Sequence, residues 1–302
     1  MISGVKEFFL KEHFESNKGT APAYLCELVV YCLELVSQLS SYGLKYRFKG
    51  GNSLLILLED PYRFSIDVDI VCTVSKEELS RLIKKIVSEC ELFHSFEVRP
   101  HKTKPWLPMI SFKLFFSSFY QKQEDAFVML DAVLEEPPYK GVLKQVKCGK
   151  IYNSGQEVEV PGISGLIADK LLTIGPKTLG IPIGKKKEAQ RLKHIFDVAL
   201  LVNHEYDLNE FKEALNRIIQ QENELQKSGF QLDEIIRDTK LFCGLPLKYE
   251  KLPDLSTIRD NDYLFEIVKG FDEFRKYIFK IDYTWERFRN DCSVILQLLD
   301  SI

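Results

Sequence analysis

The chain has 302 residues, a formal net charge of -3 and a hydrophobic fraction of 45%. These values are typical of a globular protein with one large domain or two ordinary ones, and an aromatic content of 12% excludes long disordered regions. The small net charge excludes a general attraction to nucleic acid, so any such contact requires a local patch of positive charge.

The cysteines and the apolar segments indicate a cytoplasmic protein. The seven cysteines are scattered, odd in number and without CxxC spacing, which is typical of reduced, buried thiols and not of a disulfide framework or a zinc site. Residues 1–18 carry charges throughout, unlike a secretory signal. The most apolar segment, residues 25–36, is interrupted by Glu27 and Glu34, so we expect no membrane span and no membrane partner.

The first half of the chain mixes helical and extended patterns. Apolar residues at spacings of three and four predict helices over residues 22–41 and 79–90. A glycine pair at residues 50–51 leads into a short helix that Pro61 ends. Alternating patterns predict strands over residues 44–50, 65–71, 96–102, 109–118, 126–135 and 142–148.

The pattern changes after Pro161, where the strand signals disappear. Apolar spacing predicts helices around residues 208–218 and 285–299, and residues 175–190, rich in Gly, Pro and Lys, predict a surface loop. We therefore predict the α+β class. It comprises a mixed sheet with helices in a domain of residues 1–160 and an all-helical bundle in a domain of residues 161–302.

The strand predicted over residues 65–71 carries two aspartates, Asp67 and Asp69. Alternate side chains of a strand share a face and repeat about every 6–7 Å, so both carboxylates point the same way and can reach one divalent cation. Without a cation the two charges repel each other. The alternative is a half-buried strand whose polar face meets water.

The glycine pair Gly50 and Gly51 precedes Asn52 and Ser53, which are good residues for a helix start. Such a turn brings the backbone close to a ligand and leaves the first helical N–H groups for an anion, and the Ser53 hydroxyl adds a donor. A tight turn with a polar cap explains the same residues. The sequence matches neither GxxxxGK[ST] nor GxGxxG. Arg63 either binds phosphate or pairs with an acid at the surface.

Asp131 is the only charge between Ala126 and Leu134, within a stretch that reads as a central strand. A lone buried charge is unfavourable without a partner. If a neighbouring strand placed Asp131 beside Asp67 and Asp69, the three carboxylates could hold two Mg²⁺ ions for in-line phosphoryl transfer. A surface acid near a strand end is the alternative.

Four short segments occur in an order that resembles a known family. They are "GGNS", "RFSIDVDI" with the later lone strand aspartate, "LIADKLLTI" with Lys170, and "RLKHIFDVALL" with Lys193 and Asp197. Together they span residues 48–202 and resemble the nucleotidyltransferases of the DNA polymerase β superfamily, more narrowly the AbiEii/AbiGii (type IV toxin) group. The chain departs from that pattern at His194, where the group has an acid, and in the Gly/Pro/Lys loop before Lys193.

The resemblance implies a nucleotidyltransferase that transfers a nucleoside monophosphate from a nucleoside triphosphate to an acceptor hydroxyl. It implies Mg²⁺, with Mn²⁺ as the alternative ion, and a toxin with an antitoxin partner and RNA such as tRNA as acceptor. Asp67 and Asp69 would bind both metals, and Asp131 would bind the catalytic metal and help to deprotonate the acceptor. The implied nucleotide ligands are Gly50, Gly51, Ser53, Arg63 and Lys170, with Asp197 orienting Lys170 in the cleft.

Several roles stay open at this point. Lys170 lies at the rim of an apolar helix face, from which it reaches a phosphate or carboxylate or extends to water. Asp197 orients Lys170 or pairs with Lys193 one turn earlier. The basic loop 185–193 either grips an RNA backbone or forms a solvated face, through Lys185, Lys186, Lys187, Arg191 and Lys193.

Two other function classes fit parts of the sequence. A DxD strand also holds Mn²⁺ against a nucleotide-sugar in glycosyltransferases, but that function gives the Gly50–Gly51 turn no role. Alternatively, the sheet is a catalytically inactive scaffold that binds a nucleotide or a partner protein. Nucleotide binding that is indifferent to Mg²⁺ would favour the second class, since a carboxylate cage needs the ion.

Overall fold

The computed structural model describes residues 2–58, 61–99, 107–121, 126–258 and 263–302. The chain forms two compact units. The sheet unit comprises Met1–Pro137, Gly141–Pro161 and Tyr277–Ile281. The helical unit comprises Pro138–Lys140, Gly162–Lys276 and Asp282–Ile302. Two short segments therefore depart from a single boundary after residue 160. Pro138–Lys140 belongs to the helical unit, and Tyr277–Ile281 belongs to the sheet unit.

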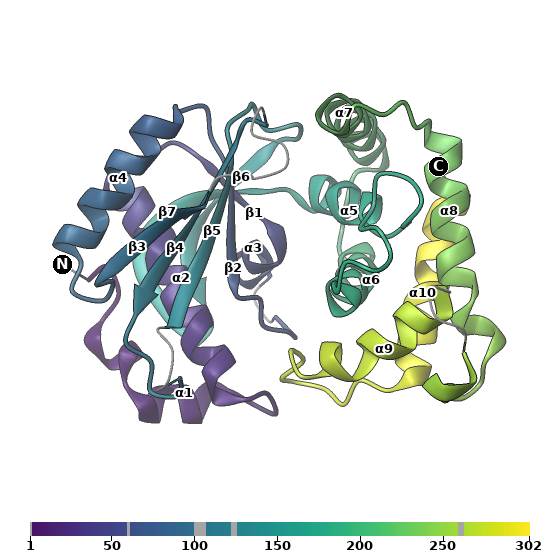
Figure 1. The fold of residues 1–302 in the computed structure, drawn as a ribbon, viewed down its shortest axis with the longest axis horizontal. Helices are drawn as coiled ribbons and strands as arrows, with labels where there is room; N and C mark the ends of the chain where they lie inside the picture. Colours follow the sequence, from purple (N-terminus) through teal and green to yellow (C-terminus); the bar gives the residue numbers. More distant parts are fainter. Residues whose placement is uncertain (1, 59–60, 100–106, 122–125, 259–262) are drawn as a thin grey trace. The chain divides into compact units, whose positions relative to one another are not determined.

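A seven-stranded mixed sheet is the centre of the sheet unit, with the strand order β3-β4-β5-β2-β1-β7-β6 (Figure 1). Strand β2 is antiparallel to β1 and parallel to β5, while β1 is parallel to β7. The strands are β1 (Arg47–Lys49), β2 (Asp67–Val71), β3 (Ser95–Arg99), β4 (Met109–Phe116), β5 (Ala126–Val133), β6 (Gly141–Cys148) and β7 (Tyr152–Pro161).

Two helices, α2 (Ala23–Ser41) and α4 (Lys76–Glu89), supply side chains to a core that also contains one face of the sheet. Val68 of β2 and Leu130 of β5 belong to this core and are fully buried. Helix α4 begins at a capping box in which Ser75 and Glu78 exchange hydrogen bonds. The residues that alternate with the core positions lie on the other face, which is half-exposed and carries the candidate site.

Helix α2 is the one helix of the described residues that is long and apolar enough to cross a membrane, and 89% of that segment is buried inside the protein. Its two acids are satisfied by hydrogen bonds. Glu27 accepts from the Phe119 N–H at 2.9 Å, and Glu34 accepts from the Tyr152 hydroxyl at 2.6 Å. This helix is therefore a core element of the sheet unit.

The sequence patterns did not reveal strand β7, although it pairs with both β1 and β6. Its second half alternates correctly, with Val158 and Val160 buried and Glu157 and Glu159 turned away from the core. The first half, "YNSG", contains turn-forming residues that obscured the pattern. The other predicted strands are present with shorter bounds, and the described part of the strand predicted over residues 96–102 ends at Arg99.

The helical unit contains six α-helices among its described residues. The helices predicted around residues 208–218 and 285–299 are present as parts of α7 and α10. The six are α5 (Ile163–Leu172), α6 (Glu188–Val202), α7 (Leu208–Gln226), α8 (Leu232–Gly244), α9 (Tyr263–Arg275) and α10 (Trp285–Asp300). Two shorter helices complete the sheet unit, α1 (Lys11–Asn17) and α3 (Gly50–Leu57).

Candidate active site

The turn between β1 and α3 requires glycine at its first position. Gly50 has φ +73°, a conformation that L side chains rarely adopt. A Cβ atom there would lie 2.0 Å from Asp69 Oδ2. The backbone of the turn therefore lies directly against one of the predicted metal-binding carboxylates, as a turn that closes on a ligand site must.

The second glycine lies equally close to its neighbours. A Cβ atom on Gly51 would lie 2.6 Å from Arg63 Nη2 and 2.7 Å from Ser65 Oγ. Helix α3 begins at Gly50, so Asn52 belongs to its first turn and does not cap it. The turn is thus packed between Asp69 on one side and the Arg63 guanidinium on the other, which connects the two chemical groups predicted to bind metal and phosphate.

The third predicted acid lies beside the first two. Asp69 of β2 and Asp131 of β5 are register partners on adjacent parallel strands, about 4.8 Å apart by the spacing of a sheet. Asp67 lies two residues before Asp69 and therefore on the same face, where it is exposed. The structure brings Asp67, Asp69 and Asp131 together on one face of the sheet, although they are 64 residues apart at most (131 − 67) in the sequence.

Two further residues lie in this row of the sheet, although the sequence did not predict them as site residues. Ser111 of β4 is the register partner of Asp131, and its hydroxyl donates to Asp131 Oδ1. Lys49 of β1 is the register partner of Asp69. The signal for Ser111 was a small polar residue in the otherwise alternating strand "MISFKLFF", which is meaningful only once the pairing with Asp131 is known.

The carboxylate row fits a magnesium ion by its chemistry and by its positions in the sheet. Magnesium prefers oxygen ligands, and Asp67, Asp69 and Asp131 supply only carboxylate oxygens on neighbouring positions of one face. Within the described residues, no three His, Cys, Asp or Glu side chains converge as a closed set of ligands.

A cysteine close to the row is chemically silent. Burial raises the pKa of Cys32 well above its ordinary value, and the negative charge of Asp67 raises it further. The thiol donates a hydrogen bond to the Ile66 carbonyl at 3.1 Å. Because the thiol stays protonated, Cys32 is neither a nucleophile nor a soft metal ligand here.

The two side chains predicted to bind phosphate beside the turn are buried. Ser53 is fully buried, and its hydroxyl donates to the Gly50 carbonyl at 2.9 Å, so in this structure it stabilises the turn. Arg63 is 5% exposed and donates from Nη1 to the Phe64 carbonyl at 2.9 Å. The interpretation of Arg63 as a residue at the surface is therefore wrong, because its guanidinium lies inside, against Gly51.

In the helical unit, Lys170 of α5 and Asp197 of α6 form a buried ion pair with 2.7 Å between Nζ and Oδ2. Both side chains are fully buried. The alternative that Lys170 extends to water is therefore wrong, and the pairing of Asp197 with Lys170 is present. Nζ makes no hydrogen bond of normal angle to any atom of the described residues, although an ammonium has three donors.

The basic loop divides into two parts with different surroundings. Lys185, Lys186 and Lys187 are exposed. Arg191, by contrast, is fully buried in α6 and pairs with Glu266 at 3.2 Å. The interpretation of Arg191 as part of an RNA-gripping patch is wrong, because its charge is neutralised inside the helical unit.

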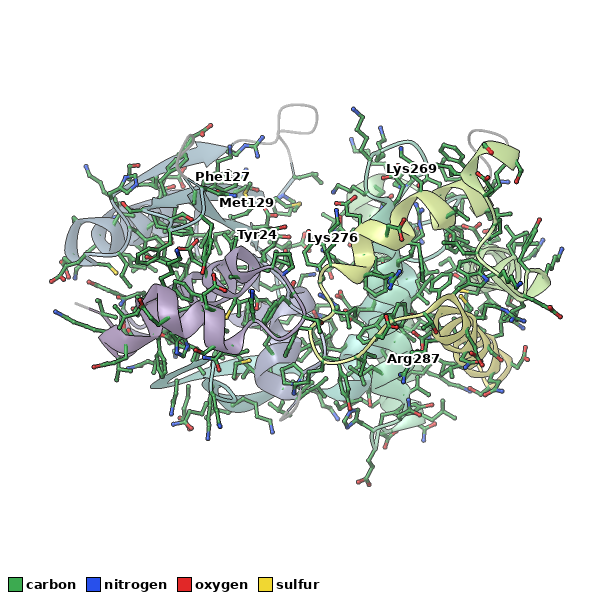
Figure 2. All side chains as sticks on the ribbon, turned by 90° about the horizontal axis from the view of Figure 1, so that it is seen from below. Tyr24, Phe127, Met129, Lys269, Lys276 and Arg287 are labelled. Carbon is green, nitrogen blue, oxygen red and sulfur yellow. The ribbon has the colours of Figure 1, made fainter. Side chains whose placement is uncertain are left out.

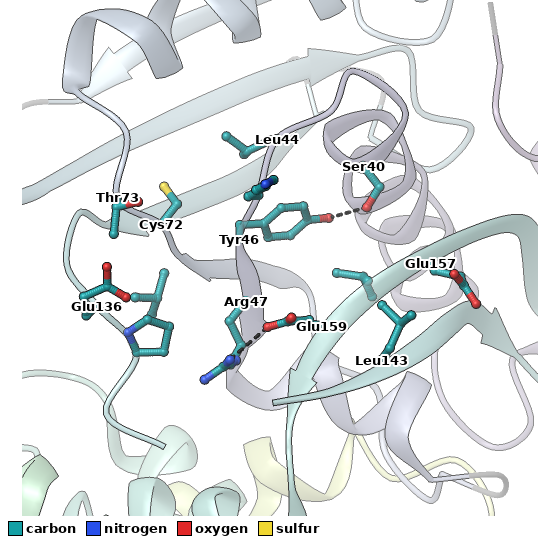
Figure 3. A pocket seen from close by; sticks show the side chains of 14 residues that line it. Ser40, Leu44, Tyr46, Arg47, Cys72, Thr73, Glu136, Leu143, Glu157 and Glu159 are labelled. Atoms are coloured by element: carbon teal, nitrogen blue, oxygen red, sulfur yellow. Dashed lines mark hydrogen bonds and ion pairs between the residues drawn. The ribbon is translucent and has the colours of Figure 1, made fainter. Parts of the chain in front are cut away.

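A pocket of about 530 Å³ lies near the start of β1, but the predicted site residues are absent from its lining (Figure 3). Its Arg47 side chain donates to Glu159 at 2.8 Å, and its Tyr46 hydroxyl donates to the Val36 carbonyl at 2.7 Å. These contacts stabilise the sheet unit. The pocket lining includes Glu157 and Glu159 on one face of β7, but Arg47 pairs with Glu159 and neither glycine of the Gly50–Gly51 turn lines the pocket. The candidate active site is therefore the row through Asp69 and Asp131 beside that turn.

A sequence model of the nucleotidyl transferase AbiEii toxin family, of the type IV toxin–antitoxin system, matches residues 34–279. The match covers most of the chain, so the chain belongs to this family and is a nucleotidyltransferase. No curated protein sequence matches the chain.

Several solved structures match this one, including the following two. The first is MenT4, a nucleotidyltransferase toxin from Mycobacterium tuberculosis, with 13% sequence identity and a TM-score of 0.53. The alignment covers 98% of this chain and 99% of MenT4. The second is an antigenic nucleotidyltransferase-like protein from Paracoccidioides brasiliensis, with 16% identity, coverage of 69% and 96%, and a TM-score of 0.40. At this identity the likeness to MenT4 shows a shared fold.

Proposed function

We propose that this nucleotidyltransferase transfers a nucleoside monophosphate from a nucleoside triphosphate to a hydroxyl of an RNA acceptor, in a reaction that requires Mg²⁺. The observation that carries the proposal is the register of Asp69 with Asp131, directly beside the Gly50 turn. This arrangement supports a reaction centre with carboxylates at its middle and a glycine turn at one side.

Asp67, Asp69 and Asp131 would hold the metal ions. Bound there, Mg²⁺, or Mn²⁺ in its place, would neutralise phosphate charge and lower the pKa of the acceptor hydroxyl. Asp131 accepts the proton of that hydroxyl, and the Ser111 hydrogen bond fixes Oδ1 of the carboxylate. Gly50, Gly51, Ser53 and Arg63 shape the turn that receives the β- and γ-phosphates, the first two through backbone N–H groups.

Lys170 and Asp197 act as a pair in this proposal. The Lys170 ammonium neutralises charge on the triphosphate as pyrophosphate leaves, and Asp197 orients it. The support is the 2.7 Å ion pair together with the hydrogen-bond capacity that remains on Nζ among the described residues.

The biological role that we propose is that of a cytoplasmic toxin whose activity is restrained by an antitoxin. Membership of the AbiEii family supports the toxin and the antitoxin. Transfer RNA is the acceptor that we favour, and the exposed Lys185, Lys186 and Lys187 are positive charges for its phosphates. The lysines bind through charge and carry no sequence specificity.

The experiment is incubation of the full chain with labelled nucleoside triphosphates, Mg²⁺ and total RNA, followed by mass spectrometry of the small RNAs. Wild type should add label to RNA, and Asp69→Asn should not. Asp272→Asn, an exposed carboxylate of the helical unit, is the matched control and should behave as wild type. Equal labelling by wild type and Asp69→Asn, or labelling that persists in a chelator, would overturn the proposal.

The glycosyltransferase alternative receives no support from the site. It gives the Gly50–Gly51 turn no role, whereas both glycines lie against site side chains at distances that exclude a larger residue. The family assignment likewise identifies an enzyme, which contradicts the catalytically inactive scaffold.

A further inference from the structure

The half-exposed face of the sheet continues beyond the carboxylates onto β4 and β3. The register places three pairs along β4 and β5 on this face: Ser111 with Asp131, Lys113 with Met129, and Phe115 with Phe127. All six are half-buried, whereas the residues between them are buried in the core. Successive pairs lie about 6–7 Å apart along the strands. Phe127 and Met129 lie close together on β5 (Figure 2).

Two aromatic rings and a lysine form a cluster at the end of this ladder. The rings of Phe115 and Phe127 meet edge to face, with 5.9 Å between their centroids. Lys113 Nζ lies 4.2 Å from the centroid of the Phe127 ring. Lys113 makes no ion pair with a described carboxylate, although Glu97 of β3 is its register partner. The ammonium charge is therefore held over an aromatic surface and left available for an anion.

A second cation extends the same row as the reaction centre. Arg99 of β3 is the register partner of Ser111, so it lies two strands, about 10 Å, from Asp131 on the same face. Arg99 is exposed. The face thus offers aromatic surface at Phe115 and Phe127 and positive charge at Lys113 and Arg99. Phe115, Lys113 and Arg99 lie on the β3–β4 side of Asp131, and Phe127 lies on the same strand as Asp131.

The strand order separates this cluster from the turn that we assign to the triphosphate. From β1 with its glycine turn, the sheet passes through the carboxylates of β2 and β5 and only then reaches β4 and β3. In-line displacement places the attacking and leaving oxygens on opposite sides of the phosphorus. If pyrophosphate leaves towards the Gly50 turn, the attacking hydroxyl must approach from the side of β4.

We infer that Phe115, Phe127, Lys113 and Arg99 form the acceptor-binding surface, and that it takes the end of a single-stranded polynucleotide. Aromatic rings bind unpaired bases by stacking, and the adjacent cations bind the backbone phosphates. The mixed character of the surface suits this ligand, because the rings offer apolar faces to bases and the neighbouring cations offer charge to phosphates. The inference rests on the proposed function and assigns its acceptor a place in the sheet unit.

The test measures binding separately from catalysis. Fluorescence anisotropy with short labelled oligouridylate and oligodeoxythymidylate compares wild type with Phe127→Leu, Lys113→Met and the double variant. Leucine keeps the apolar volume but removes the stacking ring. Each substitution should weaken oligouridylate binding, the double variant by about tenfold or more, the effect of losing roughly one base stack. Lys113→Met should also reduce the salt slope by about 0.7, since one phosphate contact disappears.

Two surface residues provide matched controls. Lys144→Met removes an exposed lysine from β6, the opposite edge strand, and Phe119→Leu removes a ring that is 43% exposed. Both should bind oligouridylate as wild type does. Thermal unfolding of every variant confirms that the sheet unit folds. In transfer assays the double variant should raise the KM for RNA and leave the KM for the nucleoside triphosphate unchanged.

The outcomes separate this inference from the proposed function. Weakened binding of oligouridylate alone supports an RNA acceptor, and equal weakening for both oligonucleotides supports a single strand of either sugar. Unchanged binding in the double variant, an equal loss of nucleoside triphosphate binding, or label found on protein would overturn the inference. An Asp69→Asn protein that transfers nucleotide like wild type overturns the proposed function, yet does not alter the binding result.

Discussion

The buried ion pairs of the helical unit and the carboxylate row of the sheet unit hold their charges in opposite surroundings. In the helical unit, Lys170 and Asp197 are fully buried and paired at 2.7 Å, and buried Arg191 pairs with Glu266. In the sheet unit, the carboxylates of the candidate site lie on a half-exposed face, gathered at neighbouring positions with a serine and a glycine turn around them.

The difference shows which charges hold the fold and which remain accessible to a ligand. A buried charge is tolerated only with a partner, and removal of one partner leaves an uncompensated charge that is strongly destabilising. Carboxylates at a half-exposed face keep their hydration and contribute little to folding, so their clustering needs another reason. The metal-assisted chemistry proposed above would supply that reason in the sheet unit, whereas the buried ion pairs of the helical unit are expected to contribute to stability.

The sharpest way to break this comparison is to remove a carboxylate from the sheet unit. Asp69→Asn should reduce nucleotide transfer by at least about a thousandfold, because the neutral amide is a poor ligand for Mg²⁺ at the centre of the reaction. Its thermal stability should stay close to that of wild type. Transfer rates and melting curves measured on one preparation test both statements, and a large loss of stability would mean that Asp69 is structural.

In the helical unit, removing a charge should affect the stability strongly, in contrast to the substitution of Asp69. Lys170→Ala leaves Asp197 buried without its partner and should lower the free energy of unfolding by about 3–5 kcal/mol. Replacing both residues, as Lys170→Met with Asp197→Leu, should recover most of that loss in urea denaturation. If the stable double variant still transfers nucleotide at the wild-type rate, the pair is structural only and the proposed role of Lys170 fails.

Alanine substitutions at two glycines separate the effect of close side-chain contact on stability from the effect of backbone conformation. Gly50 and Gly155 both have φ +73°, but a Cβ atom on Gly155 would meet nothing within 4 Å. Gly155→Ala should therefore cost only the conformational strain, about 1–2 kcal/mol. Gly50→Ala should cost roughly 1–3 kcal/mol more, because the methyl group collides with Asp69, and should abolish transfer. Equal unfolding free energies for the two variants would argue against the packed turn.

The smallest expected effect is a change of stability with pH that depends on Asp291, an acid of the helical unit that accepts a hydrogen bond from a tyrosine hydroxyl. Burial raises the pKa of Asp291 to about 7, although the Tyr283 hydroxyl donates to its Oδ2 and Arg287 lowers it partly. The folded state therefore holds the proton more tightly than the unfolded state. The stability from this group is present below about pH 4 and is lost as the pH rises towards 7.

Asp291→Asn should remove this pH dependence, since the amide oxygen still accepts from Tyr283 and carries no charge. At pH 8 the variant should be more stable than wild type, on the order of 2 kcal/mol, and the gain should shrink towards pH 4. Urea denaturation at both pH values measures the difference. If the stability rose between pH 4 and pH 7, and rose by more in wild type than in Asp291→Asn, this would contradict the raised pKa of Asp291.

The sequence was informative wherever a local pattern carried the physics. The alternation of "DVD" placed Asp67 and Asp69 on one face, and the structure agrees. The glycine pair indicated a close backbone approach, which is present at Gly50. Strand β7 was missed because polar, turn-forming residues occupy its first half, and pairing with β1 and β6 overrides that local preference.

Burial was the quantity that local patterns predicted least well. Arg63 and Arg191 read as surface cations, yet both lie inside because neighbouring carbonyls or a carboxylate satisfy them. Ser53 read as a phosphate ligand, yet its hydroxyl bonds to the backbone of its own turn. A charged or polar residue type reports the need for a partner and does not say whether that partner is water, a ligand or the protein.

The amino-acid sequence by itself determined the α+β class, the family and the identities of the acids, because periodicity and the spacing of a few residues are local properties. Only the tertiary structure decided that β5 lies beside β2 in the register that makes Asp69 and Asp131 neighbours, that Ser111 extends their row, and that Lys113 and two phenylalanines lie on the same face. The reason is that strand order and register are set by the packing of the whole core, where a shift of one residue would turn each of these side chains to the opposite face.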